Sequence, residues 1–262
     1  MEGCWERGVG VISVKTDRVM VNDKQANRAM DALRERSDPA WVPVIRRFFR
    51  DPDRHVFWGV RKSGIKAVAR EFSALSLEGI RECLHSEIHE ARSMALWILR
   101  FRYERSGEPD RETLFRFYLD QREAVVEWDL VDESAPYLVG RHLLGRDPGL
   151  LAGLVSSGRM WDRRIGIVST WWFIRNGRVG TTLALSERLL GDPEDLMHKA
   201  TGWMLREVGK RDRPGLDGFL EAWHDRMPRT MLRSALERHS PDERAKYLKG
   251  KSSRRPSGRS ST

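Results

Sequence analysis

The sequence predicts an all-α superhelical solenoid of about six HEAT-like two-helix repeats. The first observation is a short segment in which a basic residue opens an apolar run. It recurs at Arg92, Arg164, Lys199 and Arg233, which are separated by 72, 35 and 34 residues. The second observation is that turn-forming residues interrupt amphipathic helical patterns within each period. Such helix pairs cannot bury their apolar faces alone, so stacking in a solenoid is expected.

Two further segments complete the predicted repeat series. Halving the long gap predicts a repeat near position 128, where the sequence reads EWDLVDESAPYLVG. Stepping back by one period from Arg92 leads to HVFWGVRKSGIKAVARE. Within the repeats, Asp110–Thr113 opens a helix, and Gly191–Pro193 ends another.

The N-terminal region is less regular. The alternation of Val9, Val11 and Val14 fits a short strand or an unstructured leader, and the pattern leaves both open. A helical pattern begins near Asn27, passes Pro43 and extends to Arg50. The turn residues Asp51–Asp53 then end it.

Three segments are expected: a leader over 1–24, the repeat domain over 25–245 and a basic tail over 246–262. The tail has six Lys and Arg residues and no acid, and its other residues are mostly Ser, Gly and Pro. It therefore cannot bury enough apolar surface to fold. It is either a terminus that adds solubility or a non-specific contact to phosphates, which would make binding sensitive to salt.

The composition indicates a globular cytoplasmic protein. The chain has 262 residues, of which 40% are apolar and 32% charged, with a net charge of +9. No apolar stretch is long enough for a membrane span, and the N-terminus lacks the apolar core of a signal peptide. Two cysteines, Cys4 and Cys83, cannot form a disulfide framework or a four-cysteine zinc site. The seven histidines show no metal-binding spacing, so neither a metal nor a cofactor is expected. A monomer is expected because the terminal repeats are charged enough to act as caps.

Three clusters of aromatic and charged residues occupy successive repeats: 128–132 (WDLVD), 161–164 (WDRR) and 203–206 (WMLR). Equivalent repeat positions line up along one surface of a solenoid. Trp128, Arg164, Lys199 and Trp203 would then lie side by side, where basic groups could hold phosphates and indoles could stack on bases or attract a cation.

Structural interpretations of these residues remain open. Trp128 and Asp132 lie four residues apart and so share one helix face. Trp128 could be a surface residue packed by a neighbouring helix, with Asp132 as an N-cap. Arg164 and Arg206 could each pair with an acid of an adjacent helix.

Five motifs resemble those of the AlkD-type DNA alkylation repair family. These are GVRKSGIKAVARE (59–71), WDLVD (128–132), WDRR (161–164), HKATGWMLREVGK (198–210) and MPRTMLRSALE (227–237). The resemblance covers most of residues 45–240, in the family's order and roughly its spacing.

The resemblance implies a DNA glycosylase that removes purines alkylated at N3 or N7 from duplex DNA. It also implies action on a distorted duplex without enclosing the base. Catalysis is implied for Trp128, Asp132 and Trp203, with support from Arg164 and Arg206. The family carries a tyrosine near the position of Phe48 and Phe49, where this chain has none, so that contact is either missing or made by Phe49.

The chemistry suits these residue types. An alkylated purine is cationic and leaves as a neutral base, so positive charge develops on the sugar. A carboxylate about 4 Å away contributes on the order of 4 kcal/mol, or about three decades in rate. The candidate DNA contacts are the basic residues of these motifs: Arg163, Arg164, Lys199, Arg206, Arg233, Lys62 and Lys66.

Two other classes of function compete with the glycosylase. A DNA-binding relative without catalysis would keep the basic face but would not need Asp132. A protein-binding scaffold would need neither feature, and would show an exposed apolar groove instead.

Overall fold

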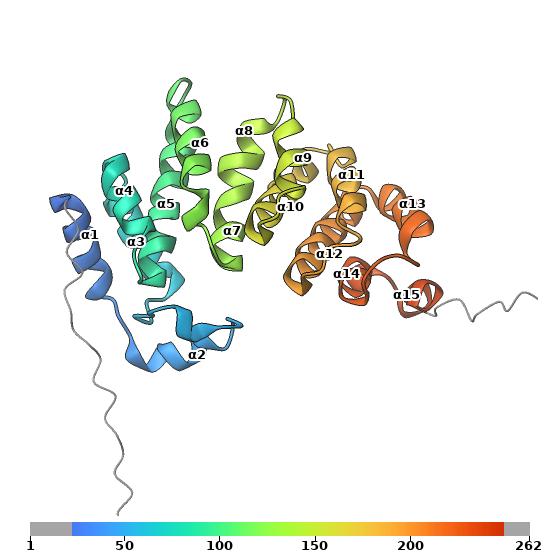
Figure 1. Cartoon of the computed structure of the whole chain (residues 1–262), viewed down its shortest axis with the longest axis horizontal. Coiled ribbons are helices and arrows are strands. Elements are labelled where there is room, and N and C mark those ends of the chain that lie inside the picture. Colours follow the sequence, from blue (N-terminus) through green and yellow to red (C-terminus); the bar gives the residue numbers. More distant parts are fainter. Residues whose placement is uncertain (1–22, 249–262) are drawn as a thin grey trace, which may run out of the picture.

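The computed structural model describes residues 23–248, and these form an all-α protein (Figure 1). Among the described residues, the only β-type pairing is an isolated bridge between Val56 and Ile88. The all-α prediction is therefore confirmed. None of the helices within 23–248 is long and apolar enough to cross a membrane.

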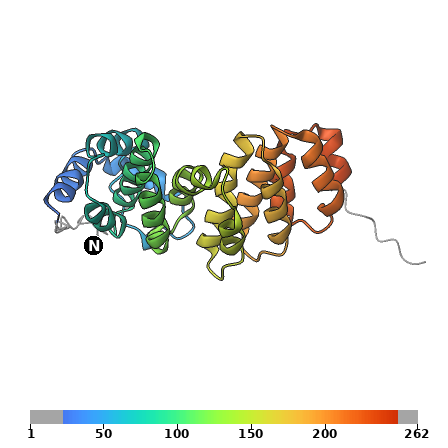
Figure 2. The same cartoon turned by 90° about the horizontal axis from the view of Figure 1, so that it is seen from above.

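The helices alternate between two rows along an arch (Figure 1). The outer row contains α1 (Lys24–Arg34), α4 (Leu77–Leu84), α6 (Asp110–Asp120), α9 (Gly149–Val155), α11 (Gly180–Arg188) and α13 (Arg213–Trp223). The inner row contains α3 (Lys62–Glu71), α5 (His89–Arg105), α7 (Trp128–Ala135), α10 (Met160–Arg175), α12 (Asp195–Gly209) and α14 (Arg229–Ala235). Each inner helix packs on the next one along the chain. Seen from above, the helices up to α6 and those from α9 onward form two groups, with α7 and α8 between them (Figure 2).

The α7 segment continues through a π-helical turn, η4 (Pro136–Gly140), into the short α8 (Arg141–Leu143). This turn packs closely on α10, because a Cβ atom on Gly140 would lie 2.0 Å from the Ser169 carbonyl oxygen. Only glycine allows the two backbones to approach so closely. The close packing holds the α7 segment against α10, and these two helices carry Asp132 and Arg164.

The helix expected from Asn27 to Arg50 does not form as one element, so this prediction is wrong. α1 ends at Arg34, and the chain resumes as a 3₁₀ turn, η1 (Pro39–Trp41), followed by the short α2 (Val42–Arg46). Asp38 is extended because it precedes a proline, which disfavours the helical region for that residue. The break over Asp51–Asp53 is confirmed, since only a 3₁₀ turn, η2 (Pro52–Arg54), follows there.

As a result, residues 35–60 form an irregular segment that lies below the inner row in Figure 1. A helix through this region would have kept these residues within the stacked rows. The irregular segment instead brings Phe48 and Phe49 into contact with α7.

The ends of the described region differ slightly from the expected boundaries. Asp23 caps α1, which begins at Lys24, within the segment predicted as a leader. α15 (Pro241–Leu248) includes Lys246, the first residue of the predicted basic tail. The rest of the leader, including Cys4, and the rest of the tail lie outside the described residues. Cys83 is buried, and burial raises the pKa of its thiol to about 12.

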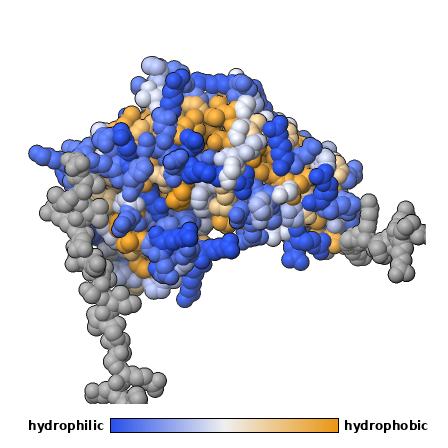
Figure 3. Space-filling model, in the orientation of Figure 1, coloured by the Kyte–Doolittle hydropathy of each residue, from blue (hydrophilic) through white to orange (hydrophobic). Residues whose placement is uncertain are grey.

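Large apolar side chains are exposed at few places in the described region. They are Phe48, Val56 and Leu150. Hydrophilic side chains surround the apolar patches visible in Figure 3. These features disfavour a protein-binding scaffold, which would need an exposed apolar groove.

Candidate functional site

An ion pair joins Asp132 of α7 to Arg164 of α10. The Arg164 Nε donates to Oδ1 of Asp132 at 3.0 Å, and its Nη2 donates to Oδ2 at 2.8 Å. Its remaining Nη1 donates to the Leu196 carbonyl oxygen, at the start of α12, at 2.7 Å. The Arg164 side chain is only 5% exposed, whereas the Asp132 side chain is 18% exposed. Arg164 therefore orients the carboxylate and is not turned outward toward a phosphate.

This geometry decides between two interpretations that the sequence left open. Arg164 pairs with an acid of the neighbouring helix, as the structural interpretation supposed. Asp132, in contrast, is not an N-cap, because it lies inside α7 and Glu127 occupies the cap position. The pairing itself places Asp132 and Arg164 together, as the alignment of repeats predicted.

Opposing effects act on the Asp132 carboxyl. Burial raises its pKa above the usual value for an aspartate, and the Arg164 guanidinium opposes that shift. The neighbouring Asp129 carboxylate raises the pKa further. Asp132 thus combines a fixed orientation with a proton affinity above that of an exposed aspartate.

Trp128, at the first position of α7, contacts the irregular segment 35–60. Its Nε1 donates to the Phe48 carbonyl oxygen at 3.1 Å, and its ring centroid lies 6.3 Å from that of Phe49. Phe49 also packs edge-on against His89, with 4.8 Å between the ring centroids. Phe49 therefore lies beside Trp128, near the position where the resemblance implied a tyrosine.

Beside Trp128 lies a buried polar network that sequence reasoning missed. Glu127 accepts from His55 Nε2 at 2.8 Å, and Arg92 Nη2 donates to His55 Nδ1 at 2.8 Å. A second branch joins His89 Nε2 to Asp129 at 2.9 Å. These residues belong to the irregular segment, to α5 and to the start of α7. No local motif marks them, since the partners are distant in sequence.

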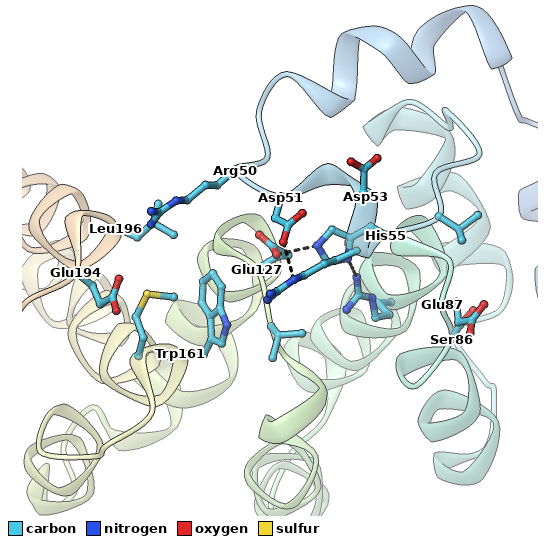
Figure 4. Close-up of a pocket in the computed structure, with 15 residues that line it drawn as sticks. Arg50, Asp51, Asp53, His55, Ser86, Glu87, Glu127, Trp161, Glu194 and Leu196 are labelled. Carbon is cyan, nitrogen blue, oxygen red and sulfur yellow. Dashed lines mark hydrogen bonds and ion pairs between the residues drawn. The ribbon is translucent and has the colours of Figure 1, made fainter.

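The network opens onto a cavity of about 740 Å³ between the irregular segment and the starts of α10 and α12 (Figure 4). His55 and Glu127 line one side, and Trp161 and Glu194 line the other, while Arg50 reaches across toward Leu196 (Figure 4). Asp132 does not line this cavity.

Trp203, the third candidate catalytic residue, lies on α12. Its Nε1 donates to Glu207 at 3.2 Å, and the side chain is half-buried. Trp128 and Asp132 thus belong to α7 and Trp203 belongs to α12. The helix α10 packs against both α7 and α12.

Several candidate DNA contacts are engaged in ion pairs. Arg163 donates to Asp192 at 2.7 Å and is largely buried. Arg206 contacts Glu237, and Lys199 lies 2.9 Å from Asp195. Lys62 pairs with Glu133 but keeps an exposed side chain, and Arg233 is exposed. The pairs of Lys199 and Lys62 are accessible to an anion that could compete for the cation, whereas that of Arg163 is not.

Basic side chains of the inner row also make cation–π contacts with aromatic rings. Lys66 lies 4.2 Å from the Trp97 ring centroid, and Arg100 lies 3.2 Å from that of Tyr137. Burial and the nearby Arg100 and Lys62 charges lower the pKa of Lys66. This crowding of like charges is what an anion-binding surface requires. The sequence motifs contained Lys66 but gave no signal for Arg100 or Tyr137.

A metal centre has no support in the described part of the chain, where no group of His, Cys, Asp or Glu side chains could hold an ion.

The fold and site together define a helical-repeat protein with a fixed, partly exposed carboxylate on its inner helices. Residues 29–239 match the family model described as DNA alkylation repair enzyme. The chain belongs to this family, which indicates a role in DNA repair with DNA as the partner. A solved structure of a predicted DNA alkylation repair enzyme from Enterococcus faecalis is similar, with a TM-score of 0.63 and 14% sequence identity. The match covers 79% of this chain and 98% of that one, and at this identity it supports the fold alone. No curated protein matches the sequence.

Proposed function

We propose that this protein is a DNA glycosylase that hydrolyses the N-glycosidic bond of cationic N3- and N7-alkylpurines in duplex DNA. The observation that carries the proposal is the Asp132 carboxylate, which Arg164 fixes with two hydrogen bonds while leaving part of it exposed. Membership of the DNA alkylation repair enzyme family indicates that the partner is DNA.

In the proposed reaction, the bond between C1′ of the sugar and the purine nitrogen breaks, and its electron pair leaves with the base. The base was cationic and departs neutral, while positive charge develops on the sugar. The Asp132 carboxylate stabilises that charge and orients a water molecule, whose oxygen bonds to C1′ and whose proton passes to solvent. At about 4 Å and an effective dielectric near 20, the carboxylate contributes on the order of 4 kcal/mol.

The two tryptophans contribute less. An indole face attracts a cation by about 0.5 to 2 kcal/mol, depending on how far water is excluded. Trp128 is held in place by the Phe48 carbonyl oxygen, and Trp203 by Glu207. The expected order of importance is therefore Asp132 first, followed by Trp128 and Trp203.

Action without base flipping is part of the proposal. Flipping enzymes enclose the base in a deep pocket. Asp132 is absent from the lining of the 740 Å³ cavity, which supports attack from outside the DNA helix. Lys62, Lys199 and Arg233 are the proposed backbone contacts that are exposed.

A catalytically silent DNA-binding protein is the second candidate. Two observations favour it: phenylalanine at position 49 in place of the implied tyrosine, and the engagement of both Asp132 oxygens by Arg164.

The deciding experiment measures free alkylated base released from methylated genomic DNA by wild type, Asp132→Asn and Asp120→Asn. Asp120 is an exposed carboxylate on α6 and serves as the matched control. Release of N3- or N7-methylpurine by wild type and Asp120→Asn, with a loss of about three decades in Asp132→Asn, would support the glycosylase. Duplex binding without release would favour the silent protein.

A further inference from the structure

The residue before Trp128 has an unusual backbone. Glu127 has φ 129° and ψ 146°, and it is the one non-glycine residue with positive φ in the region 23–248. Residues with a side chain rarely adopt this conformation, which is essentially reserved for glycine. Such strain persists only where surrounding contacts enforce it, and it is concentrated at functional sites.

Helix capping does not account for Glu127. The N-cap position favours Ser, Thr, Asp or Asn, whose short side chains accept from the first backbone amides. Glu127 occupies this position in α7 but makes no such hydrogen bond. Its carboxylate points instead toward the irregular segment, where it accepts from His55 Nε2 at 2.8 Å (Figure 4).

Arg92 fixes the other side of His55. The Arg92 guanidinium can only donate hydrogen bonds, so the His55 Nδ1 accepts from Arg92 Nη2 at 2.8 Å. The His55 proton therefore resides on Nε2, which faces Glu127. Arg92 belongs to α5 and is buried. Glu127, His55 and Arg92 therefore form a directional chain of hydrogen bonds, which we name the Glu127 latch.

The Glu127 latch and the Trp128 indole hold the same piece of chain at two points. His55 binds Glu127, and seven residues earlier the Phe48 carbonyl oxygen accepts from Trp128 Nε1. Phe49 packs against both His55 and Trp128 between these points. If the Glu127 carboxylate lost its hydrogen bond to His55, the backbone at residue 127 would be free to move. The Phe48–Phe49 segment, which supports the Trp128 indole, would be free to move as well.

We propose that Glu127 is a positioning residue: its hydrogen bond to His55, backed by Arg92, holds the strained backbone that directs the Trp128 indole toward the reacting base. The role in base release rests on the proposed glycosylase function, whereas the effect on the indole does not.

The test uses the full chain labelled with 5-fluorotryptophan and observed by ¹⁹F NMR. The chain has 10 tryptophans, and the Trp128 signal is assigned by its loss in Trp128→Phe. The variants are Glu127→Ala, Glu127→Gly and Glu127→Gln. Glycine tolerates positive φ without strain, and glutamine keeps an oxygen that accepts from His55. Glu123→Ala is the matched control, since Glu123 is an exposed glutamate just before the same helix.

We expect the Trp128 signal to shift or broaden in Glu127→Ala and Glu127→Gly, to return to its wild-type position in Glu127→Gln, and to be unchanged in Glu123→Ala. Single-turnover release of N7-methylguanine should fall by about tenfold in the alanine and glycine variants, with the dissociation constant for DNA within about twofold. Glu127→Gln should recover most of the rate.

An unchanged Trp128 signal in both the alanine and glycine variants would overturn the proposal, even if release slowed, because the effect would not act through the indole. Should the alanine variant fail to fold, the strain-free glycine variant decides alone. If wild type releases no base, the glycosylase proposal fails, but the NMR result still decides whether the Glu127 latch positions Trp128.

Discussion

At the scale of single residues, Asp132 is the side chain whose protonation state matters most. The proposed chemistry needs the carboxylate, since a neutral carboxyl would not stabilise positive charge on the sugar. Burial favours the neutral form, while the Arg164 guanidinium favours the charged one, and the net pKa lies above the usual value.

This raised pKa predicts the pH dependence of catalysis. The rate should rise with pH as Asp132 ionises and then level off, with its midpoint above the usual aspartate value of about 3.9. Single-turnover rates of base release, measured on a lesion whose uncatalysed loss is subtracted at each pH, check this. A rate that does not change with pH down to about 4 would contradict the raised pKa.

Arg164→Ala removes the partner that keeps Asp132 charged. The midpoint of the pH–rate profile should then move to still higher pH, because burial and the Asp129 charge, which both raise the pKa of Asp132, remain. Breaking a buried pair by removing one partner costs about 3–5 kcal/mol, so the free energy of unfolding should also fall. Denaturant titration and the pH profile measure the two effects separately. Arg116→Ala is the control, because Arg116 forms an exposed ion pair on α6.

The sequence predicted which of these residues lie close together, but it did not predict their hydrogen-bond partners. The spacing of Trp128 and Asp132 within one helix predicted a shared face, and the repeat period predicted that Arg164 lies nearby. Whether Arg164 faces a phosphate or a carboxylate could not be predicted, because the period does not determine side-chain rotamers. The His55–Glu127 contact spans 72 residues without a motif, so nothing local could reveal it.

At the scale of elements, the connection between the irregular segment and α3 depends on one buried acid. Glu90, in the first turn of α5, accepts from the backbone amides of Trp58, Gly59 and Val60 at 3.1, 2.7 and 3.2 Å. Glu90→Ala would leave these amides without an acceptor, each costing about 1–3 kcal/mol where it stays dry. We expect a loss of at least about 3 kcal/mol in the free energy of unfolding, measured by denaturant titration. A loss below about 1 kcal/mol would mean that water replaces the carboxylate.

Gly59 offers a sharper test of the same connection. It has φ 77°, and a Cβ atom would lie 2.1 Å from the Asp38 carbonyl oxygen. Gly177 has a similar φ of 74° but nothing within 4 Å, which makes it the matched control. Gly59→Ala should lower the melting temperature far more than Gly177→Ala, because only the former adds a collision to the backbone strain. Equal effects would show that the chain around Asp38 yields easily.

This irregular segment is also where the sequence pattern failed. The apolar spacing from Asn27 to Arg50 fits a helix, yet α1 ends at Arg34 and the chain leaves the stacked rows. Pro39 and Pro43 each lie in the first turn of a new short helical element. The spacing of apolar residues indicates which side chains are buried, but it does not distinguish burial within a helix from burial under a loop. The longer inner helices were predictable because their apolar runs are uninterrupted.

At the scale of the whole molecule, two buried histidines predict acid sensitivity. Burial lowers the pKa of His55 and of His142, and this effect outweighs the neighbouring Glu127 and Glu112 carboxylates, which raise it. In the unfolded chain they take up protons near pH 6.5, so the unfolded state binds more protons and stability falls as pH drops below that value. Unfolding free energies between about pH 7 and 5.5 should decline, and less so in His55→Gln/His142→Gln. Identical slopes would contradict the lowered pKa values.

The basic tail predicts a second property of the whole molecule. Truncation after Leu248 removes five basic residues. These are Lys249, Lys251, Arg254, Arg255 and Arg259. If they bind phosphates, the plot of log binding constant against log salt concentration becomes shallower by about 0.9 for each phosphate that the truncated chain no longer neutralises. A chain of full length with these five residues changed to serine controls for length, and an unchanged slope would leave the tail as a simple terminus.

The Arg164 guanidinium joins three consecutive inner helices, since it donates to Asp132 of α7 and to the Leu196 carbonyl oxygen at the start of α12. In a stack where each layer touches only its neighbours, curvature is the sum of small rotations between layers. A change in curvature between α7 and α12 must therefore stretch one of these hydrogen bonds or rotate the carboxylate. The curvature of the arch and the orientation of the Asp132 carboxylate are therefore coupled. A duplex that changes the curvature between α7 and α12 would also reorient Asp132.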